Sequence, residues 1–127
     1  MFAGKRPTNL GVKDGRLSPC PSSPNCVCSY DTDAVHAIVP LSFSGEPSEA
    51  IAKLKQVIQS MERTTIITES LDYLYAEFKS KLIGFVDDVE FYVDPAAKVI
   101  HVRSASRLGK SDLGVNRNRI EQIREQL

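Results

Sequence analysis

Two neighbouring stretches of the chain alternate between apolar and polar side chains, and a short turn sequence joins them. The alternating apolar residues are Phe85, Val89, Phe91 and Val93 in the first stretch and Ile100 and Val102 in the second. A period of two is typical of strands that bury one face, and Pro95–Lys98 is a natural hairpin loop between them. We therefore expect an antiparallel hairpin over residues 85–107 with one face toward a core.

The apolar pattern also predicts the register of this hairpin, because a slip by one residue would turn every apolar side chain to the wrong face. The expected pairs on the core face are Phe91 with Val102 and Val93 with Ile100. On the opposite face, the expected pairs are Tyr92 with His101 and Glu90 with Arg103, with Asp88 in diagonal reach of Arg103 and Arg107. Tyr73, Tyr75 and Glu77 of a preceding strand would join this second face. We expect that face to be an open patch of Tyr, Glu, His and Arg side chains.

The remaining pattern predicts an α+β fold. We expect strands near 36–43 and over 64–70, 72–79, 85–94 and 99–107, a helix over 47–62, and a last helix with Asn116 as its N-cap. This order, β-α-β-β-β-β-α, indicates a single antiparallel sheet with two helices on one face. The α+β domain would span residues 36–127.

Residues 1–35 contain scattered glycines and prolines and no periodic pattern, which is typical of irregular structure. A flexible tail and an ordered strap across the domain are both consistent with this composition. Leu10, Val12 and Leu17 would be the apolar anchors of a strap.

Composition excludes some classes of protein. The 127 residues contain 16 Lys plus Arg and 16 Asp plus Glu, and residues 31–100 contain twelve acidic against six basic side chains, so we expect no nucleic-acid partner. No apolar run approaches the roughly 20 residues that a membrane helix needs. The start, Met1–Pro7, has no apolar stretch after its basic residues, so we expect no secretory signal and a cytoplasmic protein.

The three cysteines, Cys20, Cys26 and Cys28, lie within nine residues of one another. Free thiols are the ordinary state of cysteines in a reducing cytosol. The alternatives are a Cys20–Cys26 disulfide and the binding of a soft metal ion by the thiolates. A zinc site usually has a second cysteine pair, which this chain lacks, although His36 or His101 could add a ligand. We expect no metal site.

Two further groups of residues suggest chemistry. Asp87, Asp88 and Glu90 could act as acid–base or metal-binding carboxylates, although ion pairing with Arg103 and Arg107 is the simpler interpretation. Hydroxyl, guanidinium and helix N-terminal groups are typical of anion sites, and the chain carries them in Arg103, Ser104, Ser106, Arg107, Asn116 and Arg117. A loop closed by internal hydrogen bonds is the alternative for this second group.

Three sequence motifs resemble the family catalogued as domain of unknown function 1499. The first comprises Arg6-Pro7, Asn9–Gly11, Leu17–Pro21 and Ser23–Val27. The second is Gly84–Phe91, and the third comprises Arg103–Arg107, Ser111–Arg117 and Arg119-Ile120. The resemblance implies a bacterial or plastid-associated family without an established activity, some of whose members have membrane segments or leaders. It also implies that residues 6–30 form an ordered strap. Cys28 replaces a serine of the family pattern, which leaves Cys20 and Cys26 as the pair that the resemblance favours.

Taken together, these features predict a non-catalytic binding module for a small polar or anionic ligand or a protein partner. Its site would combine the strand of Asp87, Asp88 and Glu90 with the strand of Arg103 to Arg107 and the loop before the last helix. An enzyme that uses Asp88 or Glu90 is the alternative, and a thiol or metal role of Cys20 and Cys26 is the second. The sequence specifies neither a cofactor nor an oligomeric state.

Overall fold

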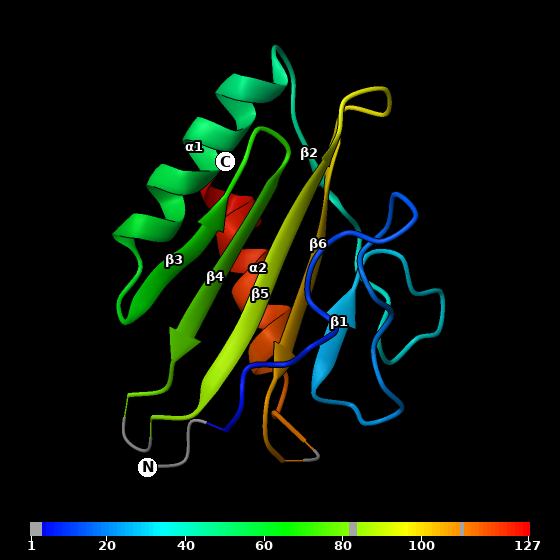
Figure 1. Ribbon diagram of the computed structural model, residues 1–127, viewed down its shortest axis with the longest axis vertical. Helices are drawn as coiled ribbons and strands as arrows, with labels where there is room; N and C mark the ends of the chain where they lie inside the picture. Colours follow the sequence, from blue (N-terminus) through cyan, green and yellow to red (C-terminus); the bar gives the residue numbers. More distant parts are fainter. Residues whose placement is uncertain (1–3, 82–83, 110) are drawn as a thin grey trace.

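The computed structural model describes residues 4–81, 84–109 and 111–127 and shows one antiparallel sheet with two helices on one of its faces (Figure 1). The elements in chain order are β1 (Cys26–Cys28), β2 (Leu41–Ser42), α1 (Pro47–Ser60), β3 (Thr64–Glu69), β4 (Tyr73–Lys79), β5 (Val86–Asp94), β6 (Val99–Ser106) and α2 (Val115–Gln126). The strands lie in the order β1-β6-β5-β4-β3, and β2 also pairs with β6. The α+β class and the predicted order of elements are therefore confirmed.

Three details differ from the sequence-based expectation. The sheet gains β1, which lies inside the stretch expected to be irregular and pairs with the free edge of β6. The strand expected near 36–43 is reduced to the two residues of β2. The last helix has Gly114, with a positive φ of 81°, at its N-cap, so the prediction of Asn116 as N-cap was wrong. Asn116 lies inside the first turn and is completely buried.

The register of the β5–β6 hairpin is the one that the apolar pattern predicts. Phe91 pairs with Val102, Val93 with Ile100, Tyr92 with His101 and Glu90 with Arg103. The apolar side chains of this register pack toward α1 and α2 and form a single core. Its fully buried members include Phe91, Val102, Leu54, Ile58, Ile120 and Ile123. This inner layer stabilises the sheet by apolar burial, and the opposite face is left to the charged residues.

Residues 4–20 cross the opposite face of the sheet before the chain enters β1, and we call this segment the strap (Figure 1). The face that the sequence predicts to be open is therefore largely covered. Glu90 is 0% exposed, Asp88 1% and Arg103 3%. Leu17 is buried as the apolar anchor of the strap, and Arg6 and Gly11 add polar contacts to the sheet. The expectation of an open patch was wrong because it did not include this cover.

Candidate functional site

The strap side of the sheet carries a cluster of charged residues in which one carboxylate is fully paired. Arg107 directly follows β6 and donates two hydrogen bonds to Asp88, from Nε to Oδ2 and from Nη2 to Oδ1, each 2.9 Å long. The hydroxyl of Tyr75 also donates to Asp88 Oδ1. These hydrogen bonds to Asp88 raise the pKa of Arg107. The pairing of Asp88 that the hairpin register predicts is thus present in its bidentate form, which is the strong form of this interaction.

Glu77 extends the paired cluster to the strap. Its Oε2 accepts hydrogen bonds from Arg107 and, at 2.6 Å, from Arg6 of the strap. Burial acts to raise the pKa of Glu77, but the two guanidinium groups outweigh it and lower the pKa overall. The first residues of the strap are therefore attached to the sheet by an ion pair.

Glu90 is buried beneath the strap and only one of its oxygens is hydrogen-bonded. Its Oε1 accepts from the backbone N–H of Gly11 and from the hydroxyl of Tyr73, each at 2.7 Å. Its Oε2 is buried and has no partner among the described residues. Burial raises the pKa of this carboxyl, and the two hydrogen bonds and the positive charge of Arg103 only partly oppose it. Gly11 has a φ of 98°, which favours glycine and lets its amide point at the carboxylate.

Arg103 lies directly opposite Glu90 in the sheet but is not bonded to it. One guanidinium nitrogen, Nη2, donates to the carbonyl of Pro19 at 3.4 Å, and the buried Nε has no partner in the described part of the chain. Among the described residues, no carboxylate forms an ion pair with Arg103. The guanidinium is therefore a buried cation, and its Nε–H group has no hydrogen-bond acceptor among the described residues.

A pocket of about 280 Å³ opens against Arg103, between the strap and β6. The residues that line it are Pro7, Asn9, Pro19, Cys20, Pro21, Asp88, Arg103, Ala105, Ser106 and Arg107. We call this cavity the Arg103 pocket. Its sheet wall carries charged and hydroxyl side chains, whereas its strap wall is formed mostly by proline.

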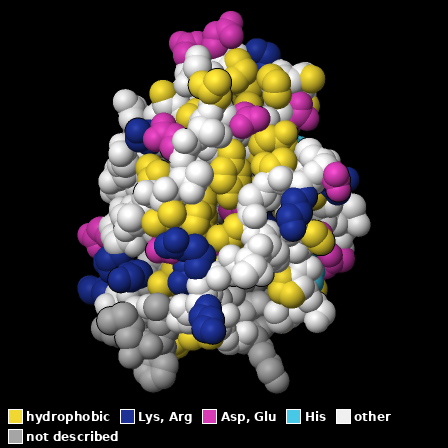
Figure 2. All heavy atoms as spheres, in the orientation of Figure 1, with side chains coloured by type: hydrophobic (Ala, Val, Ile, Leu, Met, Phe, Trp, Pro, Cys, Tyr) yellow, Lys and Arg dark blue, Asp and Glu magenta, His cyan; other side chains and the backbone are white. Residues whose placement is uncertain are grey.

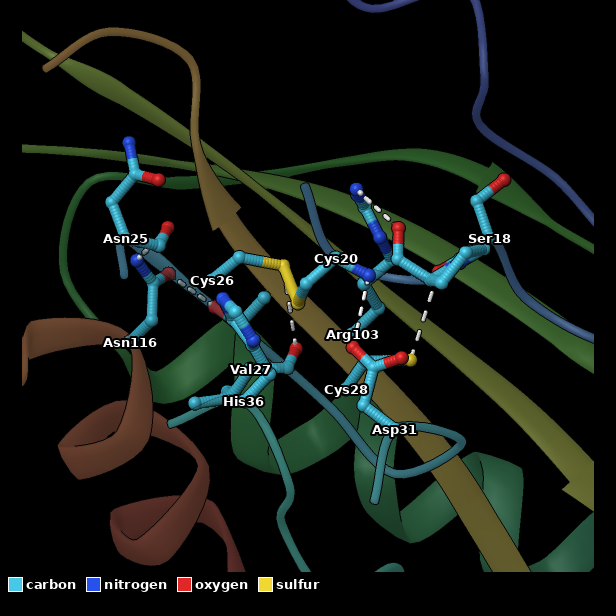
Figure 3. The surroundings of a disulfide bond; sticks show 12 residues. Ser18, Cys20, Asn25, Cys26, Val27, Cys28, Asp31, His36, Arg103 and Asn116 are labelled. Atoms are coloured by element: carbon cyan, nitrogen blue, oxygen red, sulfur yellow. Dashed lines mark hydrogen bonds between the residues drawn. A yellow bond between two sulfur atoms is a disulfide. The ribbon is translucent and has the colours of Figure 1, made fainter. Parts of the chain in front are cut away.

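A disulfide joins the strap to the sheet beside this pocket (Figure 3). Cys20 at the end of the strap is bonded to Cys26 of β1, with the two Cα atoms 5.7 Å apart. The expectation of three free thiols was therefore wrong, and the pair is the one that the family resemblance implies. Cys28 is free and buried, its Sγ lies 3.6 Å from the carbonyl oxygen of Ser18, and burial raises its pKa. A thiol with a raised pKa is a poor nucleophile.

Four of the predicted site residues lie on the helix side of the sheet instead. Asp87 is bonded to Arg119 of α2 at 2.7 Å, and Ser104 donates to Asn116 at 2.6 Å. Asn116 donates in turn to Ser106 and to Asp112. The members of this network bond to one another, so the network ties α2 to the sheet. The structure thus separates Asp87, Ser104 and Asn116 from Asp88, Glu90, Arg103 and Arg107, and Ser106 touches both groups.

Arg117 lies apart from both groups. It donates to the backbone carbonyl of Val35 at 3.1 Å and lines a different surface pocket beside Pro24 and Val27. The predicted site is therefore three sites, and on the strap side a pocket adjoins a buried cation that has no ion-pair partner among the described residues. Lys110, which the sequence places in the loop before α2, lies outside the described residues.

The residues that the sequence prediction missed are those of the strap wall and its attachment. Asn9, Gly11 and Pro19 form contacts or line the Arg103 pocket, although each is far from the sheet in sequence. The only signal for them was that they lie within the first motif of the family resemblance. Arg119, the partner of Asp87, could have been found because it lies three residues after Asn116 on one helix face.

Within residues 4–81, 84–109 and 111–127, one group of side chains has atoms close enough to hold a metal ion. Ligand atoms of Asp31, Asp33 and His36 lie within 4.8 Å of one another. Both ring nitrogens of His36 are already engaged, Nδ1 with Asp33 at 2.7 Å and Nε2 with the carbonyl of Ser23 at 2.9 Å. The bond to Ser23 and the pairing with Asp33 raise the pKa of His36, which favours an imidazolium over a metal ligand. His101 instead bonds Ser29 and stacks on Tyr30.

Comparison with known proteins gives one match. Residues 16–127 match the family described as "Protein of unknown function (DUF1499)". The chain matches no curated protein and no solved structure. The match begins at Arg16, so Arg6 and Gly11 of the strap precede it. Among the described residues, no helix has the length and apolar character to cross a membrane.

Proposed function

The chain belongs to the DUF1499 family of proteins of unknown function, and we propose that it is a non-catalytic binding module for a small anion. The anion occupies the Arg103 pocket and is held by the guanidinium of Arg103. The observation that carries the proposal is that this guanidinium is 3% exposed, faces a pocket and has no ion-pair partner among the described residues.

The energetic argument is that a buried charge without a counter-charge is costly to a fold. The other guanidinium groups of the buried network are paired, Arg107 with Asp88 and Arg119 with Asp87. Glu90 is the cross-strand neighbour of Arg103, but burial raises the pKa of Glu90 and so favours its neutral form. A bound anion would supply the missing negative charge and accept hydrogen bonds from the guanidinium of Arg103. Carboxylate and phosphate oxygens have the right geometry to accept such bonds.

The size and access of the pocket select between the two ligand classes that the sequence predicts. A volume of about 280 Å³ lies below the usual range for drug-sized ligands, so it suits a compact anion such as phosphate, sulfate or a short dicarboxylate. Protein partners need a wide open surface, whereas the strap covers this face. Lys and Arg side chains gather over the lower half of this face, toward the end where the chain enters the strap, and would attract such an anion (Figure 2).

The alternative of an enzyme rests on the free oxygen of Glu90. An acid–base carboxyl must reach the substrate as well as carry a shifted pKa. Asp88 lines the pocket but is saturated by Arg107 and Tyr75, and Glu90 has a raised pKa but does not line the pocket. The two requirements thus fall on different residues, and this favours binding over catalysis.

The test is calorimetric titration of the purified chain with phosphate, sulfate and succinate. We expect saturable binding of at least one of these anions and a loss of about tenfold or more in affinity for Arg103→Gln, since one charged hydrogen-bonding group is removed. Arg117→Gln is the matched control, because it removes the same charge from a predicted site residue outside the pocket. Equal affinity of Arg103→Gln and the unaltered chain, or no saturable binding of any of the three anions, would refute the proposal.

A further inference from the structure

We propose that the Cys20–Cys26 disulfide positions the strap wall of the Arg103 pocket, so that its reduction lowers the affinity of the pocket for its anion. This inference rests on the proposed function and adds that thiol reductants regulate the same site. It starts from the fact that the disulfide joins the wall of the pocket to β1, the strand that pairs with β6, and residues of β6 form part of the pocket floor.

The strap wall is built from three consecutive residues around the disulfide. Pro19, Cys20 and Pro21 all line the pocket, and the carbonyl of Pro19 accepts the hydrogen bond from Arg103. Both prolines lack an N–H group and cannot donate to the sheet. The position of this wall therefore depends on Cys20.

The other attachments of Cys20 and its neighbours are few. The N–H of Cys20 donates to Asp31 at 2.9 Å, and the Sγ of Cys28 contacts the carbonyl oxygen of Ser18 at 3.6 Å. A sulfur donor forms only a weak hydrogen bond. The hydroxyl of Ser18 also donates to the carbonyl of Asn9 at 2.7 Å, and Arg103 donates to that of Pro19 at 3.4 Å. Beyond these contacts and the buried side chain of Leu17, the disulfide is the covalent tether of residues 18–21 in the described structure.

The first half of the strap has attachments of its own that do not involve sulfur. Arg6 pairs with Glu77 at 2.6 Å, and the N–H of Gly11 donates to Glu90 at 2.7 Å. Leu17 then provides an apolar anchor ahead of the disulfide. Reduction should therefore release residues 18–21 while residues 4–17 and the helix side of the sheet stay in place.

The geometry allows a reductant to reach one sulfur of the pair. Cys20 is partly exposed, whereas Cys26 is 1% exposed. A thiolate of a dithiol reductant attacks Cys20 Sγ, the S–S bond breaks, and Cys26 leaves as a thiolate that takes up a proton. The second thiol of the reductant then attacks the mixed disulfide and releases Cys20 as a thiol. The protein gains two electrons and two protons, and the dithiol becomes a disulfide.

Cys28 reports on the strap independently of any ligand. Its thiol is 0% exposed and lies beneath the carbonyl of Ser18. If residues 18–21 leave the sheet, an alkylating reagent gains access to this thiol. The Cys20→Ser/Cys26→Ser double variant retains Cys28 as its one cysteine, so the labelled site is unambiguous.

The experiment compares the unaltered chain, with its disulfide oxidised, and the double variant. It measures their affinity for phosphate and sulfate and the rate at which iodoacetamide labels Cys28. We expect a fall of about tenfold or more in affinity and a rise of about tenfold or more in the labelling rate for the double variant, with an unchanged circular dichroism spectrum. Cys28→Ser is the matched control for affinity. It keeps the disulfide, so it should bind like the unaltered chain when oxidised and lose affinity when reduced.

Two results would overturn the inference, and they can be told apart from each other. If the oxidised chain binds the anion and the double variant binds it equally well, the disulfide does not position the wall, and the proposed function stands. If the oxidised chain binds neither anion, the proposed function fails and this inference fails with it. Faster labelling of Cys28 would then show only that the strap is released.

Discussion

Arg103 and Glu90 face each other across β5 and β6, and yet each directs its charged group to the strap rather than to its neighbour. Glu90 is bonded to the N–H of Gly11, and Arg103 to the carbonyl of Pro19. Each residue keeps one buried atom without a partner in the described structure, Glu90 Oε2 and Arg103 Nε. Buried polar groups are normally satisfied, so the orphaned Nε of Arg103, a residue that lines the pocket, supports the proposed site.

The raised pKa of Glu90 leads to a prediction about pH. A carboxyl whose pKa is higher in the folded than in the unfolded state stabilises the fold at pH values below its unfolded pKa. That stability is lost as the pH rises through the folded pKa. Glu90→Gln imitates the neutral carboxyl at all pH values and keeps the oxygen that accepts from Gly11 and Tyr73. We expect its free energy of unfolding, relative to the unaltered chain, to increase as the pH rises above the ordinary pKa of a glutamate, about 4, toward neutral pH.

Urea unfolding of both proteins across this range measures the difference. Because the other titrating groups are common to the two proteins, they cancel in the comparison. A difference that stays constant with pH would show that Glu90 titrates alike in the folded and unfolded chains, contrary to this account.

At the scale of elements, the strap is attached by a backbone amide whose geometry needs glycine. Gly11→Ala should lower the free energy of unfolding by about 1–2 kcal/mol, because a positive φ strains an L side chain and the amide shifts away from Glu90. Gly15→Ala is the matched control. Gly15 has a φ of 72°, and a Cβ added there would meet no atom within 4 Å, as at Gly11.

The comparison by urea unfolding separates the two contributions. Gly15→Ala should lose only the free energy that the strained positive φ costs an alanine. The additional loss of unfolding free energy in Gly11→Ala therefore measures the hydrogen bond to Glu90. If the two variants lose equal stability, the amide of Gly11 does not support the buried carboxyl.

The sheet elements could be predicted from sequence because their information is local. Alternation in residues 85–107 determines which side chains share a face, and the pairs Phe91–Val102 and Glu90–Arg103 follow from it. The strap could not be placed in the same way. Its contacts join residues as far apart as Arg6 and Glu77 or Gly11 and Glu90, and an irregular segment has no period that predicts its neighbours.

The candidate site was predicted in part for the same reason. Strand parity separates Asp87 from Asp88 and Glu90, and the structure places Asp87 on the helix side with Arg119. Parity also places Ser104 with the helices, but the sequence prediction still assigned it to the site because hydroxyl groups are common in anion sites. The buried network of Ser104 and Asn116 shows that these polar groups serve packing between β6 and α2.

On the scale of the whole molecule, the sheet separates two interiors of different chemistry. The helix side holds the apolar core and the polar network of Ser104 and Asn116, whereas the strap side is a layer of buried charges. Residues 4–20 cross that layer (Figure 1). Because the strap continues into β1 at the edge of β6, the same segment covers the charges and completes the sheet. A ligand in the Arg103 pocket would therefore contact both the sheet and its cover, and would stabilise the closed arrangement by mass action.

The most direct test is the melting temperature of the unaltered chain and of Arg103→Met as the phosphate concentration rises. Without phosphate, Arg103→Met should be the more stable protein by about 1 kcal/mol, because it lacks an uncompensated buried charge. As phosphate is added, the melting temperature of the unaltered chain should rise and that of the variant should stay constant. If instead Arg103→Met melts lower without phosphate and the unaltered chain does not respond to phosphate or sulfate, Arg103 is part of the scaffold and the binding site is not there.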